Sequence, residues 1–374
     1  MGKRQLTLAT VLALAAFLGL SAVAHAGVVA TIAGRREGTV TLQPGVVRVG
    51  ADAIPWADVM LVVNDAVADR VAAPNALRFK NGEVLVGRIT SISKKKVTIE
   101  AAIFGTQTIE TDHLAAIDFV PGLGAVPGGK NAVLYREAGK PIPGKIRGLR
   151  EDRLTIDSPI GAVALKTAGL KRYVFAAGAT VPMSLATDEV TLCDGNVLRG
   201  TVLPAQNALV VEHPTLGKRS FGPKTWVSVR RYSGPAWYLS DLQPIAVESY
   251  PLINRLADMP RMEFNSGVAT GPVSQILVSP RTRMEYTIPG KPGEKYLLTA
   301  VVHLLDGSRG SARFEIRIDG KPQLEKILNP GSEKQLAVSF DVPVGSELEI
   351  DVDFDDRVRF PCGVSIDNAL LVKK

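Results

Sequence analysis

Four aspartates near the carboxyl terminus have the residue type and spacing of a cation site. They are Asp351, Asp353, Asp355 and Asp356, and the first three alternate along one expected strand, so their side chains share a face. A hard cation such as Ca²⁺ needs several oxygen ligands. The stretch lacks the glycine and terminal glutamate of the helix-loop-helix calcium motif, and an edge strand facing water has the same pattern. A structural calcium is therefore one reading, and no other cofactor is predicted.

Residues that could carry out catalysis are sparse. After the first 26 residues the chain has three histidines, His113, His213 and His303, which are far apart and outside any motif. The sequence contains no G-x-S-x-G, H-E-x-x-H or C-x-x-C, the signatures of common nucleophile, zinc and redox sites. Paired carboxylates for glycoside hydrolysis have no sequence signature of their own. We predict that the protein is not an enzyme.

The first 26 residues indicate the compartment. Lys3 and Arg4 precede an apolar run from Leu6 to Val23, and the segment ends in Ala-His-Ala. This is the pattern of a secretory signal peptide, with cleavage predicted after Ala26. The apolar run is shorter than the ~20 residues of a spanning helix, so a retained anchor is the less favoured alternative. We expect a secreted or periplasmic protein that is not an integral membrane protein once processed.

Composition favours β structure and several domains. The chain of 374 residues has 35 glycines and 24 prolines, and its apolar runs are short and rich in Val, Ile and Thr. Long helices are therefore not expected, and the fold class is predicted to be all-β. A chain of this length exceeds a single ordinary core, so two or more domains are expected.

The charge is uneven along the chain. Residues 27–235 hold 26 Lys and Arg against 18 Asp and Glu, whereas residues 236–374 hold 16 against 19. Outside the cytoplasm, a basic surface suits anionic envelope polymer or lipid headgroups better than nucleic acid. A merely solvated surface explains the same numbers, and no nucleic-acid partner is predicted.

The first half contains repeats. Residues 76–120, 131–175 and 188–232 align when their glycines are superposed, and each is typical of a small β-meander or barrel. Residues 27–75 resemble the second half of a unit and are predicted to be a truncated or capping copy. Each unit alone buries little apolar surface, so neighbouring units should pack together. The matching glycines are Gly87, Gly144 and Gly200, and Gly105, Gly161 and Gly217; the tryptophans expected in the cores are Trp56 and Trp226.

The last third alternates as strands of a sandwich do. Residues 312–319 place Ala312, Phe314, Ile316 and Ile318 on one face and polar residues on the other, and Asp-Gly follows as a tight-turn signal. Residues 336–342 and 348–354 repeat the alternation. Residues 236–374 are therefore predicted to form a jelly-roll-like β-sandwich.

Three stretches of this region carry a family resemblance. They are YLSDL (238–242), FEIRIDGK (314–321) and SIDNALLV (365–372). Together they resemble the NPCBM family, the carbohydrate-binding module associated with glycosyl hydrolase family 98, with a galactose-binding-like fold. The resemblance covers Trp237 to Val372 and implies sugar binding through loops at one end of the sandwich, often in exported multidomain proteins. The chain departs from the family at Ile366, where a tryptophan is common.

A sugar site requires an aromatic face for the apolar side of the ring, with charged or amide groups for the hydroxyls. In this region we single out Tyr250, Arg281, Arg357, Arg359 and Trp237. Trp237 and its neighbour Tyr238 open the domain, so packing is their alternative role. We predict an exported non-catalytic protein that binds carbohydrate or envelope polysaccharide. The alternative is a structural or assembly protein of the cell envelope, whose sandwich contacts protein partners.

Overall fold

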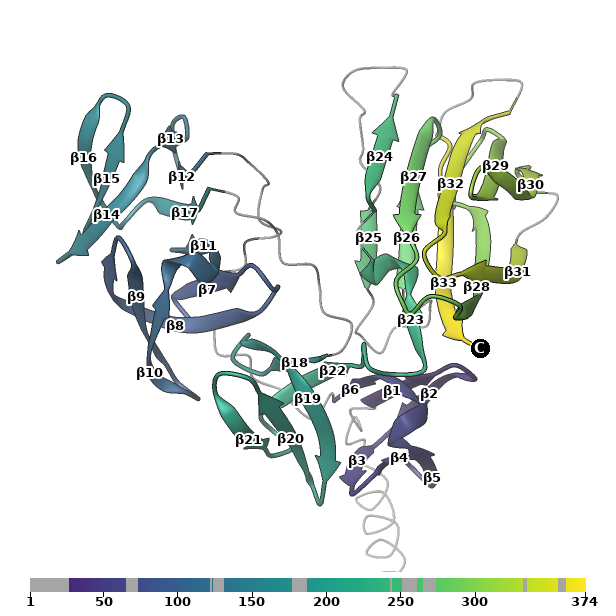
Figure 1. Cartoon of the computed structure of the whole chain (residues 1–374), viewed down its shortest axis with the longest axis horizontal. Coiled ribbons are helices and arrows are strands. Elements are labelled where there is room, and N and C mark those ends of the chain that lie inside the picture. Colours follow the sequence, from purple (N-terminus) through teal and green to yellow (C-terminus); the bar gives the residue numbers. More distant parts are fainter. Residues whose placement is uncertain are drawn as a thin grey trace, which may run out of the picture.

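The computed structural model describes residues 27–64, 73–121, 123, 131–176, 187–242, 244–250, 261–264, 274–331, 335–355 and 361–374 (Figure 1). Every regular element in these ranges is a β-strand or a single 3-10 turn, so the all-β prediction is confirmed. The predicted leader, residues 1–26, lies outside the described residues. Within the described ranges no helix is long and apolar enough to cross a membrane.

One order of strand pairing occurs four times in the first 230 residues. In the second repeat each of the first three strands pairs with the next one. A 3-10 turn then leads into the fifth, closing strand, which pairs with the first strand of the repeat. These elements are β7 (Asn75–Phe79), β8 (Val84–Ser93), β9 (Lys96–Ala101), β10 (Gly105–Glu110), η2 (Thr111–His113) and β11 (Leu114–Asp118).

The other three repeats follow the same order. The third repeat comprises β12 (Val133–Arg136), β13 (Ile142–Pro143), β14 (Lys145–Arg150), β15 (Arg153–Ser158), β16 (Gly161–Lys166) and β17 (Leu170–Val174). The fourth comprises β18 (Asp188–Leu192), β19 (Val197–Ala205), β20 (Ala208–His213), β21 (Gly217–Phe221) and β22 (Trp226–Arg230). The first comprises β1 (Gly27–Thr31), β2 (Gly34–Gly38), β3 (Val40–Gln43), β4 (Val46–Val49), β5 (Asp52–Pro55), η1 (Trp56–Asp58) and β6 (Val59–Val63). The first segment, expected to be truncated, thus has both an opening hairpin and a closing strand that pairs with β1.

The recurring glycines mark a close approach between strands. A Cβ atom on Gly87 would lie 2.2 Å from the carbonyl oxygen of Glu100, and one on Gly200 would lie 2.5 Å from that of Glu212. Any larger residue at either position would collide with the backbone of the next strand. The second glycine of the register, Gly105, has a φ of +68°, which suits glycine at a hairpin turn.

The four repeats associate as two pairs: the first with the fourth, and the second with the third. The closing strands β6 and β22 pair, so the first and fourth repeats share one core, in which Trp56 and Trp226 are buried as predicted. The closing strands β11 and β17 pair in the same way, and the second and third repeats share another core. Strands β8 and β14 also pair, which joins β10, β9, β8, β14, β15 and β16 into one antiparallel sheet.

Hairpin residues exchange hydrogen bonds between the second and fourth repeats. The carboxylate of Glu83 accepts the backbone N–H of Arg199 over 2.8 Å, and the side-chain oxygen of Asn196 accepts that of Val86, also over 2.8 Å. Glu83 follows Gly82 as Asn196 follows Gly195, so the two bonds join equivalent positions. A near-symmetric contact thus connects the two repeat pairs.

The last third is a sandwich of two antiparallel sheets, as predicted (Figure 1). One sheet has the order β25, β26, β33, β28, β31, with β23 pairing to β33, and the other has the order β24, β27, β32, β29, β30. The elements are β23 (Ala236–Tyr238), η3 (Leu239–Asp241), β24 (Ala246–Ser249), β25 (Arg261–Phe264), β26 (Ser274–Val278), β27 (Thr282–Thr287), β28 (Lys295–Leu304), β29 (Ala312–Ile318), β30 (Lys321–Leu328), β31 (Leu336–Pro343), β32 (Glu347–Phe354) and β33 (Val364–Lys373).

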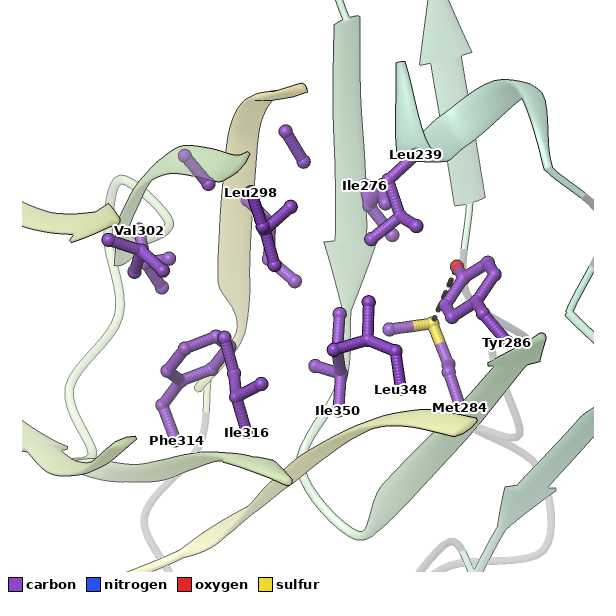
Figure 2. Close-up of a cluster of buried hydrophobic side chains, with 14 of the residues drawn as sticks. Leu239, Ile276, Met284, Tyr286, Leu298, Val302, Phe314, Ile316, Leu348 and Ile350 are labelled. Carbon is purple, nitrogen blue, oxygen red and sulfur yellow. Dashed lines mark hydrogen bonds between the residues drawn. The ribbon is translucent and has the colours of Figure 1, made fainter. Parts of the chain in front are cut away.

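The sandwich core is the face that the alternation predicted. Figure 2 shows Phe314 and Ile316 of one sheet pointing toward Leu298 and Val302 of the other. Ala312 and Ile318 are buried as well. The opposite face of β29 is polar, as predicted, yet Glu315 is buried there because the guanidinium of Arg317 lies over it, with Nε–Oε1 and Nη2–Oε2 distances of 2.6 and 2.7 Å.

The first repeat and the sandwich meet through an apolar cluster, here called the junction end. Tyr238 and Ala236 of β23 pack with Leu61 and Met60 of β6 and against Leu370 of β33. The carboxylate of Asp241, which is nearly fully buried, forms an ion pair with Arg230 of the fourth repeat. Burial raises the pKa of Tyr238 to about 12.

Candidate ligand-binding site

Two of the predicted sugar contacts, Tyr250 and Arg281, lie side by side at the end of the sandwich remote from the junction. Tyr250 follows β24 and Arg281 precedes β27, and these strands pair with Ser249 opposite Thr282. The backbone N–H of Tyr250 donates to the carbonyl oxygen of Arg281 over 2.9 Å. Sheet pairing therefore brings together two residues that are distant in the sequence.

The ring of Tyr250 is available to a ligand. Tyr250 is 58% exposed, and its hydroxyl donates to Oε2 of Glu248 over 3.2 Å. A phenol ring offers an apolar face together with a polar group, which is the combination that a sugar ring requires. The bond to Glu248 restrains the direction of the ring without covering it.

Arg281 has an unusual backbone conformation. Its φ is +64°, in the left-handed region that a residue with a long side chain rarely adopts. Such a conformation costs about 1 kcal/mol or more relative to glycine. It directly follows Pro280, its side chain is exposed, and its backbone carbonyl lies beside the backbone of Tyr250.

Polar residues at the ends of three neighbouring strands lie at this same end of the sandwich. The hydroxyl of Ser311, before β29, donates to Oδ1 of Asn329, after β30, over 2.7 Å. The backbone N–H of Asp355, after β32, contacts the carbonyl of Ser311 at 3.4 Å. We call this set, Tyr250, Arg281, Ser311, Asn329 and Asp355, the open rim. It combines an aromatic face with cationic, amide, hydroxyl and carboxylate groups.

The other predicted contacts do not join the open rim. Arg357 and Arg359 lie outside the described residues. Trp237 is at the junction end, where it pairs with Leu371 near the end of β33, and its ring centroid is 5.1 Å from that of Tyr296. The indole Nε1 of Trp237 donates to the carbonyl of Tyr232 over 2.7 Å. The structure gives Trp237 the packing role that was its alternative.

Two of the aspartates proposed for calcium are in contact with arginines. Nε of Arg283 lies 3.2 Å from a carboxylate oxygen of Asp351, and Arg313 lies 3.6 Å from Asp353. Asp356 lies outside the described residues, and calcium binding stays a prediction. A different acidic group, Glu285, Glu347 and Glu349, has carboxylate oxygens within 4.8 Å of one another, and Glu349 is paired with Arg317 at 2.9 Å.

A polar network that the sequence did not reveal lies on the first sheet of the sandwich. Nε2 of His303 lies 2.9 Å from Oδ2 of Asp367, whose other oxygen accepts the hydroxyl of Ser365 and the amide of Gln275. In a nucleophilic triad the histidine lies between the serine and the acid. Here the acid lies between the other two, so His303 has no contact with the hydroxyl that it would have to activate.

A cavity of about 490 Å³ separates the second and fourth repeats, and both His113 and His213 line it. Nδ1 of His213 accepts the backbone N–H groups of Thr215 and Leu216, so the ring proton is on Nε2, which donates to Glu83 over 2.8 Å. Burial favours a higher pKa for Glu83, but hydrogen bonds from His213, Asn81 and the Arg199 amide outweigh it and lower the pKa. Glu83 and His213 are thus occupied by structural contacts. The feature of the sequence that points to this contact between the repeats is the pair of hairpins at Gly82 and Gly195, which occupy equivalent positions.

Comparisons with known proteins give fold likenesses only. No protein-family model matches the chain, and no curated protein matches it. Among solved structures, the CBM51 module of Clostridium perfringens GH95 in complex with methyl-galactose is 17% identical, with a TM-score of 0.30, over 37% of this chain and 99% of that chain. The tandem CBM51 modules of Sp3GH98 from Streptococcus pneumoniae SP3-BS71 are 11% identical, with a TM-score of 0.29, over 80% and 88%. The CBM51-2 and INT domains of Clostridium perfringens ZmpB, in complex with GlcNAc, are 12% identical, with a TM-score of 0.29, over 59% of this chain and 43% of that one. TM-scores and identities of this size support no conclusion about function.

Proposed function

We propose that this chain is an exported, non-catalytic protein that binds carbohydrate through the open rim of its C-terminal sandwich. The observation that carries the proposal is the exposed ring of Tyr250, whose backbone is fixed beside that of the exposed Arg281 by a hydrogen bond. The stretches that resemble the NPCBM family support the same reading, and membership of that family is part of the proposal. Export depends on the predicted cleavage after Ala26, which amino-terminal sequencing of the secreted protein would test.

The chemistry of the open rim suits a sugar ring. The phenol face of Tyr250 can contact the apolar face of a pyranose, and Arg281 can donate paired hydrogen bonds to hydroxyl or acidic substituents. Asp355 and Asn329 add acceptors and an amide donor farther along the same end of the sheet, about 10 and 19 Å from Tyr250 by strand spacing, where further sugars of a longer glycan would lie. Because these groups come from four strand ends of one sheet, the packed core holds their backbones in place.

A glycan array tests the proposal on the purified chain, followed by titration with the best glycan. Tyr250→Ala is expected to weaken binding about tenfold or more, because it removes the stacking face. Ile245→Ala is the matched control, since Ile245 is 59% exposed on the same segment and lies outside the open rim. Equal losses in both variants, or no glycan bound by the unaltered chain, would contradict the proposal.

The same titration examines calcium and the alternative function. If the aspartates near residue 353 hold a structural calcium, EDTA should weaken binding and added Ca²⁺ should restore it. If no glycan binds and envelope proteins co-purify instead, the assembly role becomes the better account.

A further inference from the structure

Three cations lie in one row across the third repeat. Arg150 of β14 is directly opposite Arg153 of β15, and Arg153 is directly opposite Lys166 of β16. Residues directly opposite each other in an antiparallel pair project from the same face of the sheet. All three side chains are exposed, and in the described part of the chain none has a carboxylate within 4 Å.

The rest of this face carries small side chains, two further cations and three acids. The adjacent row consists of Gly148, Thr155 and Ala164, whose small side chains leave the cations uncovered. Further along lie Lys94 and Arg147, which both reach Asp157, at 4.0 and 3.7 Å. Two exposed acids, Glu151 and Asp152, occupy the turn between β14 and β15. We call Lys94, Arg147, Arg150, Arg153 and Lys166 the basic face.

Equivalent strands in the other repeats are arranged differently. In the second repeat Arg88 is opposite Glu100, and Lys96 is opposite Glu110, on the same sheet. In the fourth repeat Glu212 is opposite Lys218, at 3.8 Å. Like charges directly opposite each other destabilise a sheet. The third repeat therefore retains a destabilising arrangement that the same fold avoids elsewhere.

From this contrast we infer that the basic face binds a linear acidic polysaccharide. Carboxylate or sulfate groups along such a chain can each pair with a guanidinium or ammonium group and relieve the repulsion within the row. The basic face has no aromatic side chain on which bases could stack, as single-stranded nucleic acid would require. One exposed isoleucine at the hairpin turn, Ile160, is far less than the apolar surface of a membrane-binding element. The inference is independent of the open rim, because the two surfaces are in different domains.

The test uses polygalacturonate fragments as the probe and the purified chain, titrated at increasing NaCl. The triple variant Arg150→Gln, Arg153→Gln, Lys166→Gln should bind about tenfold or more weakly and with a shallower salt dependence, because charge-assisted contacts are lost. The matched control is Lys218→Gln, Lys224→Gln, Lys321→Gln, which removes the same charge from exposed positions outside this sheet. The control should bind like the unaltered chain.

A thermal measurement distinguishes lost binding from lost folding. Without polysaccharide, the triple variant should melt at the same temperature as the unaltered chain or higher, because repulsion has been removed. Polygalacturonate should raise the Tm of the unaltered chain and of the control, and raise that of the triple variant less. The inference is overturned if the unaltered chain does not bind polygalacturonate at low salt or if both triple variants bind equally. Preference for phosphatidylglycerol vesicles or for duplex DNA over polygalacturonate would overturn it as well.

Discussion

The two ends of the C-terminal sandwich use the same residue types for different purposes. At the junction end, Tyr238 is buried against the first repeat, and an arginine from the fourth repeat neutralises the buried Asp241. At the open rim, Tyr250 is exposed and its neighbour Arg281 is held in a left-handed conformation. Aromatic and charged groups thus stabilise one end, whereas the other end carries them at a cost in stability. Such a cost is a feature of binding sites more than of packing surfaces.

The largest effect is expected at the junction end. Tyr238→Ala removes a buried aromatic ring, so the free energy of unfolding should fall by about 3 kcal/mol or more. Urea unfolding followed by tryptophan fluorescence measures the change. Tyr250→Ala, in the same experiment, should alter it by no more than about 0.5 kcal/mol. Similar losses at the two ends would remove the distinction between them.

A smaller loss is expected when the buried carboxylate at the junction is neutralised. Asp241→Asn keeps the shape of the side chain but weakens the pairing with Arg230, and it should lower the free energy of unfolding by roughly 1–2 kcal/mol. Asp341→Asn is the comparison, because its pair with Lys374 is half exposed on both sides. That change should stay within about 0.5 kcal/mol. An equal effect of the two substitutions would show that burial of the junction pair is immaterial.

Alkaline pH should weaken the junction end through the buried phenol of Tyr238. The pKa of Tyr238 is about 12 when folded, against about 10 in an unfolded chain, so folding favours the protonated phenol. Its contribution is complete below pH 10 and is lost as the pH rises from about 10 to about 12, at about 1 kcal/mol for each pH unit. The difference between the unaltered chain and Tyr238→Phe isolates this tyrosine from the others. If the two proteins lose stability in parallel over this range, the buried phenol is not responsible.

The smallest effect is a gain in stability at the open rim. Arg281→Gly should raise the free energy of unfolding by about 0.5 kcal/mol, because glycine adopts positive φ without strain. The same substitution should weaken glycan binding, because it removes the one cationic side chain of the open rim. Chemical denaturation and titration of one preparation measure both. A variant that is more stable yet binds glycan unchanged would separate Arg281 from the site.

Local patterns predicted more of the fold than of the site. The buried positions of β29 followed from strict alternation, and the glycine register followed from a contact between adjacent strands. Trp237 could not be placed, because its partners Tyr296 and Tyr232 come from the sandwich and from the end of the repeats. The row of Arg150, Arg153 and Lys166 also escaped notice, because its members come from three strands and face one another only when the two hairpins are aligned.

Nothing in the sequence indicated which repeats would share a core. The glycine spacing is nearly constant and therefore suggests contacts between neighbours. The structure pairs the first repeat with the fourth through β6 and β22, while the second and third lie between them in the chain. Contacts between residues so far apart leave no periodic signal in a single sequence.

This nested pairing determines the order in which the repeats can fold. During synthesis the amino-terminal repeat emerges first, yet half of its core arrives only with residues 188–230. All the buried residues of the core that the middle two repeats share are present by Val174, so this core can condense earlier. The repeat that is synthesised first is then the last of the four to become stable. In the interval its apolar strand Val59–Val63 remains exposed to solvent.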